Sequence, residues 1–193
     1  MDKDQLHEAR TNPDFLKYLE ETRVDAIATK NISALYEVLD SFLVLDLHED
    51  RLNEVYQHIL HISSENIEKI LSSNRKLTLE GDDLFYIRAF YEHAIEKWSY
   101  EDFEGSKQLI FVLSNIIEDE VLSDSLKAHI IALSNKNSLD DFYGMEVNLN
   151  EIDDDEKYGY FITNFNYNIK GHLEHNKNTL QKEYDNLKHL LED

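Results

Sequence analysis

The stretch "AFYEHAIEKW" (residues 89–98) contains the side chains of this chain best suited to acid–base or metal chemistry. On a helix, Glu96 lies about one turn after His93, so the two side chains are neighbours. Glu92 follows Arg88 by four residues, and we expect an ion pair between them. A tight metal site needs more than two ligands. We therefore expect His93 and Glu96 to form a solvated surface pair.

A pair of histidines elsewhere in the sequence also has a spacing compatible with metal binding. His58 and His61 lie about one helical turn apart, and with His93 and Glu96 they are the candidate metal ligands of the sequence. A di-iron centre in a helical bundle uses Glu-x-x-His pairs, but no histidine here has Glu three positions before it. Structural histidines remain the favoured interpretation, so we predict no cofactor.

His129 falls between Leu126 and Leu133 on the apolar stripe of a predicted helix. This position predicts a buried, neutral imidazole that is hydrogen-bonded to the backbone or to a Ser or Asn side chain. Phosphate-binding glycine loops, His-Glu-x-x-His and Gly-x-Ser-x-Gly are absent from the sequence, so no catalytic residue is predicted. The acidic run Asp153–Glu156 matches a calcium loop in composition but not in ligand spacing.

Charge limits the classes of partner. The 193 residues include 40 acidic and 19 basic ones, a formal net charge of −21, with no block of Lys and Arg. Such a surface repels nucleic acids and anionic membranes, and it attracts basic proteins. Cysteine is absent, which excludes disulfides and Cys-ligated metals. Since no apolar leader or bilayer-spanning run is found, the sequence predicts a cytoplasmic protein.

Helical periodicity dominates the chain up to Gly144. Asn12 and Pro13 mark a helix start as N-cap and first helical residue, and Ser99 with Asp102 has the spacing of a capping box. The predicted helices cover Pro13–Thr29, Ile32–Leu45, His48–Ile62, Glu65–Leu71, Leu84–Trp98, Tyr100–Ile117 and Val121–Leu133, followed by a short helix ending near Gly144. The predicted core contains Leu39, Phe42, Leu52, Ile59, Tyr91, Ile95, Trp98, Ile110, Leu113, Leu126 and Leu133.

After Gly144 the sequence becomes rich in Asn and acids. Apolar or aromatic residues at alternate positions predict a strand over residues 161–169, with Val147 and Leu149 as its partner in a small β-hairpin; a helix over Glu156–Asn166 is the alternative. An amphipathic helix ends the chain, and its narrow apolar face can pack on the core or on a second copy. We predict a helical core domain over residues 1–144, with residues 145–193 packed on it.

The stretch "KWSYEDFEGSKQLIFVLSNIIED" places an aromatic-plus-acidic turn before a small residue and then bulky residues at helical spacing. The residues concerned are Tyr100, Asp102, Ser106, Ile110 and Leu113. This pattern, within residues 84–143, resembles the second half of a tetratricopeptide repeat, although the closing proline of that family is missing. Gly105 and Ser106 would allow close approach of the paired helix. The resemblance implies a helical-hairpin scaffold that binds proteins or peptides.

The sequence therefore predicts a mainly α fold, either an antiparallel helical bundle or a short helical-hairpin stack, with an added β-hairpin near residues 145–170. The first functional hypothesis is a non-enzymatic protein-interaction module, such as an adaptor or chaperone-like scaffold, marked by a groove with exposed aromatics and an acidic rim. One alternative is an acidic inhibitor, immunity protein or nucleic-acid mimic in a basic site. The other is a metal-dependent enzyme assembled from dispersed side chains such as His58, His61, His93, Glu96 and His129.

Overall fold

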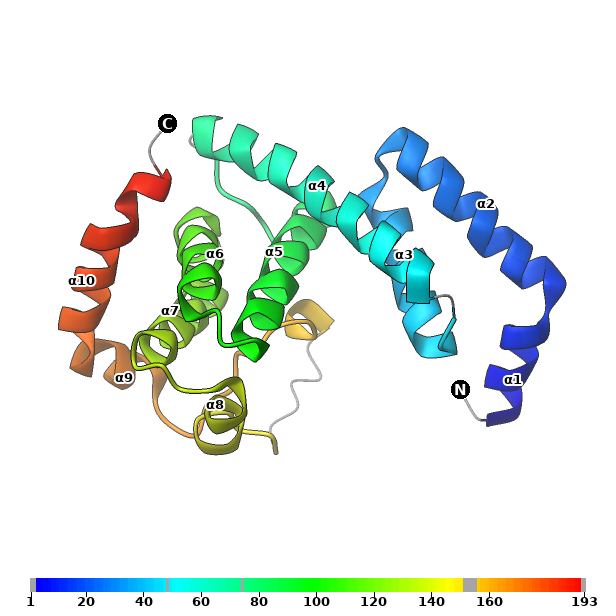
Figure 1. Ribbon diagram of the computed structural model, residues 1–193. Helices are drawn as coiled ribbons and strands as arrows, with labels where there is room; N and C mark the ends of the chain where they lie inside the picture. Colours follow the sequence, from blue (N-terminus) through cyan, green and yellow to red (C-terminus); the bar gives the residue numbers. More distant parts are fainter. Residues whose placement is uncertain (1–2, 48, 74, 151–155, 192–193) are drawn as a thin grey trace. The chain divides into compact units, whose positions relative to one another are not determined.

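The computed structural model describes residues 3–47, 49–73, 75–150 and 156–191 (Figure 1). Over these ranges the chain forms ten α-helices and two short 3-10 helices, and its β-structure is limited to two isolated bridges. The predicted mainly α fold is therefore confirmed. Within the same ranges, no helix is both long and apolar enough to cross a membrane.

The helices group into two compact units, and the boundary between them in the sequence falls between Asn66 and Ile67. The predicted boundary near residue 144 does not coincide with this division. Side chains after that point, including Val147, Phe161 and Leu187, belong to the same hydrophobic core as the helices that precede it. The C-terminal quarter of the chain thus completes the core of the second unit.

The first unit contains α1 (Lys3–Thr11), α2 (Pro13–Thr29), α3 (Ile32–Leu45) and the beginning of α4 (Glu49–Ser73). Asn12 caps α2 as predicted, since its side-chain oxygen accepts hydrogen bonds from the N–H groups of Asp14 (3.0 Å) and Phe15 (3.2 Å). Lys30 ends the same helix in the left-handed conformation. Half of α3 is buried, which agrees with its predicted central place, but Leu43 and Val44 are exposed.

The helix α4 is continuous, whereas the sequence predicted two helices with a break near residue 63. Its buried positions include Val55, Ile59, Ile62 and Ile70, so one apolar stripe extends along the whole helix. Serines are tolerated within it because no proline or glycine interrupts the backbone hydrogen bonds.

The second unit is built on three consecutive helices that pack side by side, α5 (Gly81–Ser99), α6 (Phe103–Ile116) and α7 (Glu120–Ser134) (Figure 1). Nine of the predicted core residues are buried, and the exceptions, Leu52 and Ile95, are partly exposed. After α7 come α8 (Leu139–Met145), the 3-10 turn η1 (Glu156–Tyr158), α9 (Ile169–His175), α10 (Lys177–Leu187) and η2 (Lys188–Leu191).

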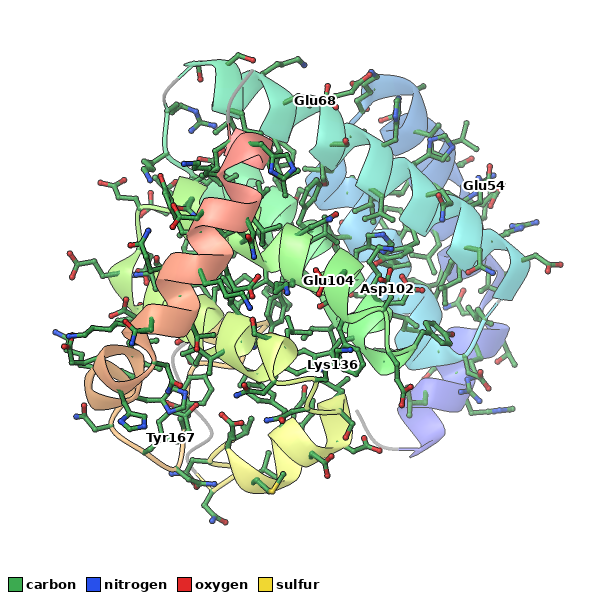
Figure 2. All side chains as sticks on the ribbon, turned by 60° about the vertical axis from the view of Figure 1, so that its left-hand side comes forward. Glu54, Glu68, Asp102, Glu104, Lys136 and Tyr167 are labelled. Carbon is green, nitrogen blue, oxygen red and sulfur yellow. The ribbon has the colours of Figure 1, made fainter. Side chains whose placement is uncertain are left out.

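The turn between α5 and α6 corrects two sequence-based expectations. Asp102, and not Ser99, is the N-cap of α6, because Glu101 takes the left-handed conformation and ends the preceding helix (Figure 2). The Asp102 carboxylate accepts a hydrogen bond from the N–H of Gly105 (2.9 Å), and a Cβ on that glycine would collide with the carboxylate. The glycine therefore serves the cap and not the approach of a helix, while Ser106 is buried in the core.

The predicted β-hairpin is reduced to a single antiparallel bridge between Val147 and Phe165. Ile169, expected at the end of a strand, instead opens α9, because the Asn168 side chain accepts a hydrogen bond from the N–H of Gly171 (2.9 Å). The alternative helix over Glu156–Asn166 is also wrong beyond the short turn η1. The alternating apolar residues belong to an extended segment that packs on helices. Such a segment does not need the regular backbone hydrogen bonds of a β-sheet.

A buried ion pair fastens α10 to α6. The Lys107 Nζ lies 3.1 Å from the Glu183 Oε2, and both side chains are more than nine-tenths buried. Lys107 also contacts Glu104, an exposed residue at the start of α6 (Figure 2). Removing one member of a buried pair leaves an uncompensated charge in an apolar setting.

We expect Glu183→Ala to lower the free energy of unfolding by about 2–4 kcal/mol, because it removes the buried one of the two carboxylates that neutralise the Lys107 ammonium and leaves only the exposed Glu104. The matched control is Glu174→Ala, which breaks an exposed pair with Lys177 and should cost no more than about 0.5 kcal/mol. Urea denaturation measures both. Equal losses would show that the buried pair does not hold α10.

Candidate functional site

The candidate metal ligands do not converge. His61 faces Glu65 (Nε2 to Oε1, 3.4 Å), and His93 pairs with Glu96 (Nδ1 to Oε2, 2.9 Å), as expected for solvated helical pairs. His58 is half-buried on α4. Among the described residues, no group of three or more metal-binding side chains is found.

Two further expectations concern acidic residues. Glu92 forms the predicted ion pair with Arg88 (Nε to Oε1, 2.7 Å), and the buried Arg88 guanidinium also lies 4.1 Å from the centre of the Tyr160 ring. The acidic run that resembles a calcium loop begins at Asp153, and its first three residues lie outside the described ranges.

His129 lies at the centre of the second unit and is completely buried. Its Nδ1 is 2.7 Å from the carbonyl oxygen of Ser125, so Nδ1 must carry the proton and donate it. Its Nε2 then accepts from the Tyr91 hydroxyl (3.1 Å), whose oxygen accepts in turn from the N–H of Ile162 (3.1 Å). Burial lowers the pKa of His129 to about 4 and raises that of Tyr91. The predicted buried, neutral imidazole is thus confirmed.

Aromatic rings enclose this imidazole. Its ring centre lies 4.9 Å from Phe142, 6.0 Å from Trp98 and 6.2 Å from Phe165. The rings come from α5, α8 and the extended segment before α9. The segment is not part of a sheet, and it is held by the Tyr91 hydroxyl, by these ring contacts and by hydrogen bonds to the turn after α8, such as Asn166 N–H to the Glu146 carbonyl (2.8 Å).

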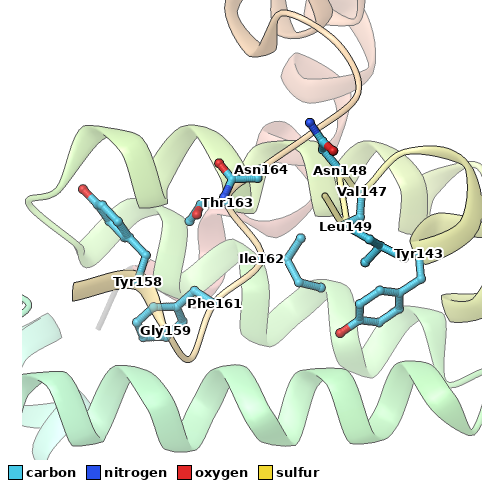
Figure 3. Close-up of a pocket in the computed structure, with 10 residues that line it drawn as sticks. All are labelled: Tyr143, Val147, Asn148, Leu149, Tyr158, Gly159, Phe161, Ile162, Thr163 and Asn164. Atoms are coloured by element: carbon cyan, nitrogen blue, oxygen red, sulfur yellow. The ribbon is translucent and has the colours of Figure 1, made fainter. Parts of the chain in front are cut away.

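The extended segment forms one wall of a pocket of about 220 Å³, which we call the loop pocket (Figure 3). Its lining residues are Tyr143, Val147, Asn148, Leu149, Tyr158, Gly159, Phe161, Ile162, Thr163 and Asn164. The N–H of Asn148 donates to the carbonyl of Asn164 (3.0 Å), which holds the two walls together. Figure 3 shows Ile162 between Tyr158 on one side and Tyr143 with Leu149 on the other.

Several large apolar side chains are exposed on this part of the chain. Leu149 and Met145 are each 63% exposed, and Tyr143 and Tyr160 are about two-fifths exposed. Between residues 137 and 168 the sequence has eight acidic residues and one base, Lys157. That lysine lies 2.6 Å from the Asp119 carboxylate, which also accepts from the Tyr158 hydroxyl and whose pKa is lowered by these contacts despite partial burial.

For this region the sequence predicted a β-hairpin and did not predict a pocket. The Asn-rich alternation around Phe165 was the available signal, yet the lining comes from the residues just before it and from the turn after α8. Comparison with known proteins adds no relatives: no family model matches the chain, and no curated protein or solved structure matches it significantly.

The buried imidazole makes stability depend on pH. His129 titrates near its ordinary pKa of about 6.5 in the unfolded chain but only at about 4 in the folded one. The unfolded state therefore binds more protons between these values, and stability should fall as the pH drops from about 6.5 to about 4, by up to ~3 kcal/mol. His129→Gln should flatten this part of the profile. An NMR titration of His129 near 6.5 in the folded protein would contradict the expectation.

Tyr91→Phe removes one hydroxyl and leaves two buried partners unsatisfied, the His129 Nε2 and the Ile162 N–H. We expect a loss of about 2–4 kcal/mol in the free energy of unfolding and faster hydrogen exchange at the Ile162 amide. Tyr100→Phe, at a side chain that is 79% exposed, is the control and should change little. Unchanged exchange in Tyr91→Phe would mean that the hydroxyl does not hold the pocket wall.

Proposed function

We propose that the protein is a protein-interaction module whose loop pocket binds a basic segment of a partner protein through one apolar anchor side chain. The observation that carries this proposal is the co-occurrence of a pocket, exposed apolar and aromatic side chains, and a strong excess of acids in residues 137–168. Exposed apolar patches with a polar rim are typical of protein-binding surfaces.

The size of the loop pocket supports an anchor and not a whole small molecule. Small-molecule sites usually measure about 300–1,000 Å³, and this pocket is smaller, at about 220 Å³. A single apolar side chain entering it would contact Ile162 and the rings of Tyr143 and Tyr158. Burial of such a side chain contributes about 1.5–3 kcal/mol, the usual scale of an interface anchor.

The charge around the loop pocket supports a basic partner segment. Asp140 and Asp141 are exposed on α8, next to Tyr143 in sequence, and the nearby Lys157 is paired with Asp119. Lysine and arginine flanking the anchor would meet these acids, which raises the rate of association and favours the correct register. The lining itself offers apolar surface, tyrosine hydroxyls and asparagine amides, which are recognition groups.

The test is selection from a random peptide library on the wild-type protein, followed by affinity measurement. We expect peptides with an apolar residue flanked by Lys or Arg. Tyr143→Ala and Leu149→Ser should each weaken binding about tenfold, equivalent to ~1.4 kcal/mol. Tyr100→Ala removes an exposed tyrosine outside the pocket and should bind normally.

Salt and sequence preference separate this proposal from an acidic inhibitor that occupies a basic site. A peptide held by an apolar anchor keeps much of its affinity at high salt. Purely electrostatic binding is lost, because ~1 M salt screens the interaction between exposed charges. Selected peptides without an apolar consensus, or equal binding by the Tyr143→Ala and Tyr100→Ala variants, would contradict the proposal.

A further inference from the structure

A second pocket, of about 300 Å³, lies within the second unit between α6, α7 and α10. We call it the helix pocket. Its lining residues are Phe111, Ser114, Asn115, Lys127, Ile130, Lys177, Leu180, Gln181, Glu183 and Tyr184. The volume is at the lower end of the usual range for small-molecule sites, which suits a ligand of one or two rings.

Apolar and aromatic side chains supply one part of the lining. Phe111 and Ile130 are buried residues of α6 and α7, and Leu180 and Tyr184 lie one turn apart on α10. The Phe111 and Tyr184 rings are in contact, with centres 5.9 Å apart. A flat apolar body can therefore pack against rings and aliphatic groups from three helices.

Two lysines from different helices supply the charge of the helix pocket. Lys127 pairs with Asp124 on α7 (2.8 Å), and Lys177, the first residue of α10, pairs with Glu174 on α9 (2.6 Å). The Lys177–Glu174 pair is largely exposed and therefore weak, whereas the Lys127–Asp124 pair is partly buried. Since an ammonium has three N–H donors, each lysine can keep its acid and still donate to a ligand.

The acid in the helix pocket does not cancel these lysines. Glu183 is buried and paired with Lys107 (3.1 Å), so its charge is already compensated. Asp124 and Glu174, which pair with the two lysines, are not among the lining residues. A ligand carboxylate would share the two ammonium groups with these acids, so the N–H donors of Lys127 and Lys177, and not an excess of positive charge, favour an anion.

We infer that the helix pocket binds a small amphipathic carboxylate, with the apolar body against Phe111, Ile130 and Tyr184 and the carboxylate between Lys127 and Lys177. This site is separate from the loop pocket, and none of its lining residues is shared. The inference does not depend on the proposed function, because it uses neither the loop pocket nor the acidic residues near it.

The experiment compares naphthoate with naphthamide, which have the same rings and differ in charge, by titration calorimetry on the full chain and by chemical shifts in the protein NMR spectrum. We expect naphthoate to bind at least about tenfold more tightly. The double variant Lys127→Gln/Lys177→Gln should reduce naphthoate binding to the level of naphthamide and leave naphthamide unchanged. Tyr184→Ala should weaken both ligands.

The matched control is Lys17→Gln, which removes a lysine from an exposed helical pair with Glu21 outside the pocket. It should bind both ligands as the wild type does. The inference is overturned if neither ligand binds, if the two bind equally, or if the double variant and the control behave alike. Shifts confined to loop-pocket residues would also overturn it, because they would place the ligand elsewhere.

Discussion

The second unit depends on one buried hydrogen-bond chain, from the Ile162 N–H to the Tyr91 hydroxyl, the His129 imidazole and the Ser125 carbonyl. The Tyr91, His129 and Ser125 members are buried and Ile162 is partly buried, so a break at the core groups would leave a neighbour unsatisfied. These hydrogen bonds specify one tautomer of the His129 imidazole and help to fix the extended segment, which is not part of a sheet. Through Ile162, this core interaction determines the wall of the loop pocket.

The two pockets show how one helical framework produces surfaces of different chemistry. The loop pocket is formed mostly by irregular backbone after α8, in an acidic part of the sequence. The helix pocket lies between regular helices, and its lysines extend from two of them. The first is suited to a peptide anchor, and the second to a compact anion.

Local signals predicted the elements that depend on local physics. Asn12 caps α2, Glu92 pairs with Arg88, and His93 pairs with Glu96, because each partner lies within four residues on the same helix. The errors had two causes, a distant partner in one case and an overlooked local pattern in the other. The segment around Phe165 alternates like a strand but docks on helices, and α4 continues through residue 63 because its apolar stripe is continuous.

By itself, the amino-acid sequence determined the mainly helical class, the acidic surface and the burial of His129, since periodicity and composition are properties of the chain alone. Only the tertiary structure decided that Tyr91 is the partner of His129, that Lys107 meets Glu183, and that the residues of the two pockets converge. The first two contacts join positions 38 or more residues apart, and the residue pattern of one helix does not specify which distant side chain completes such a contact.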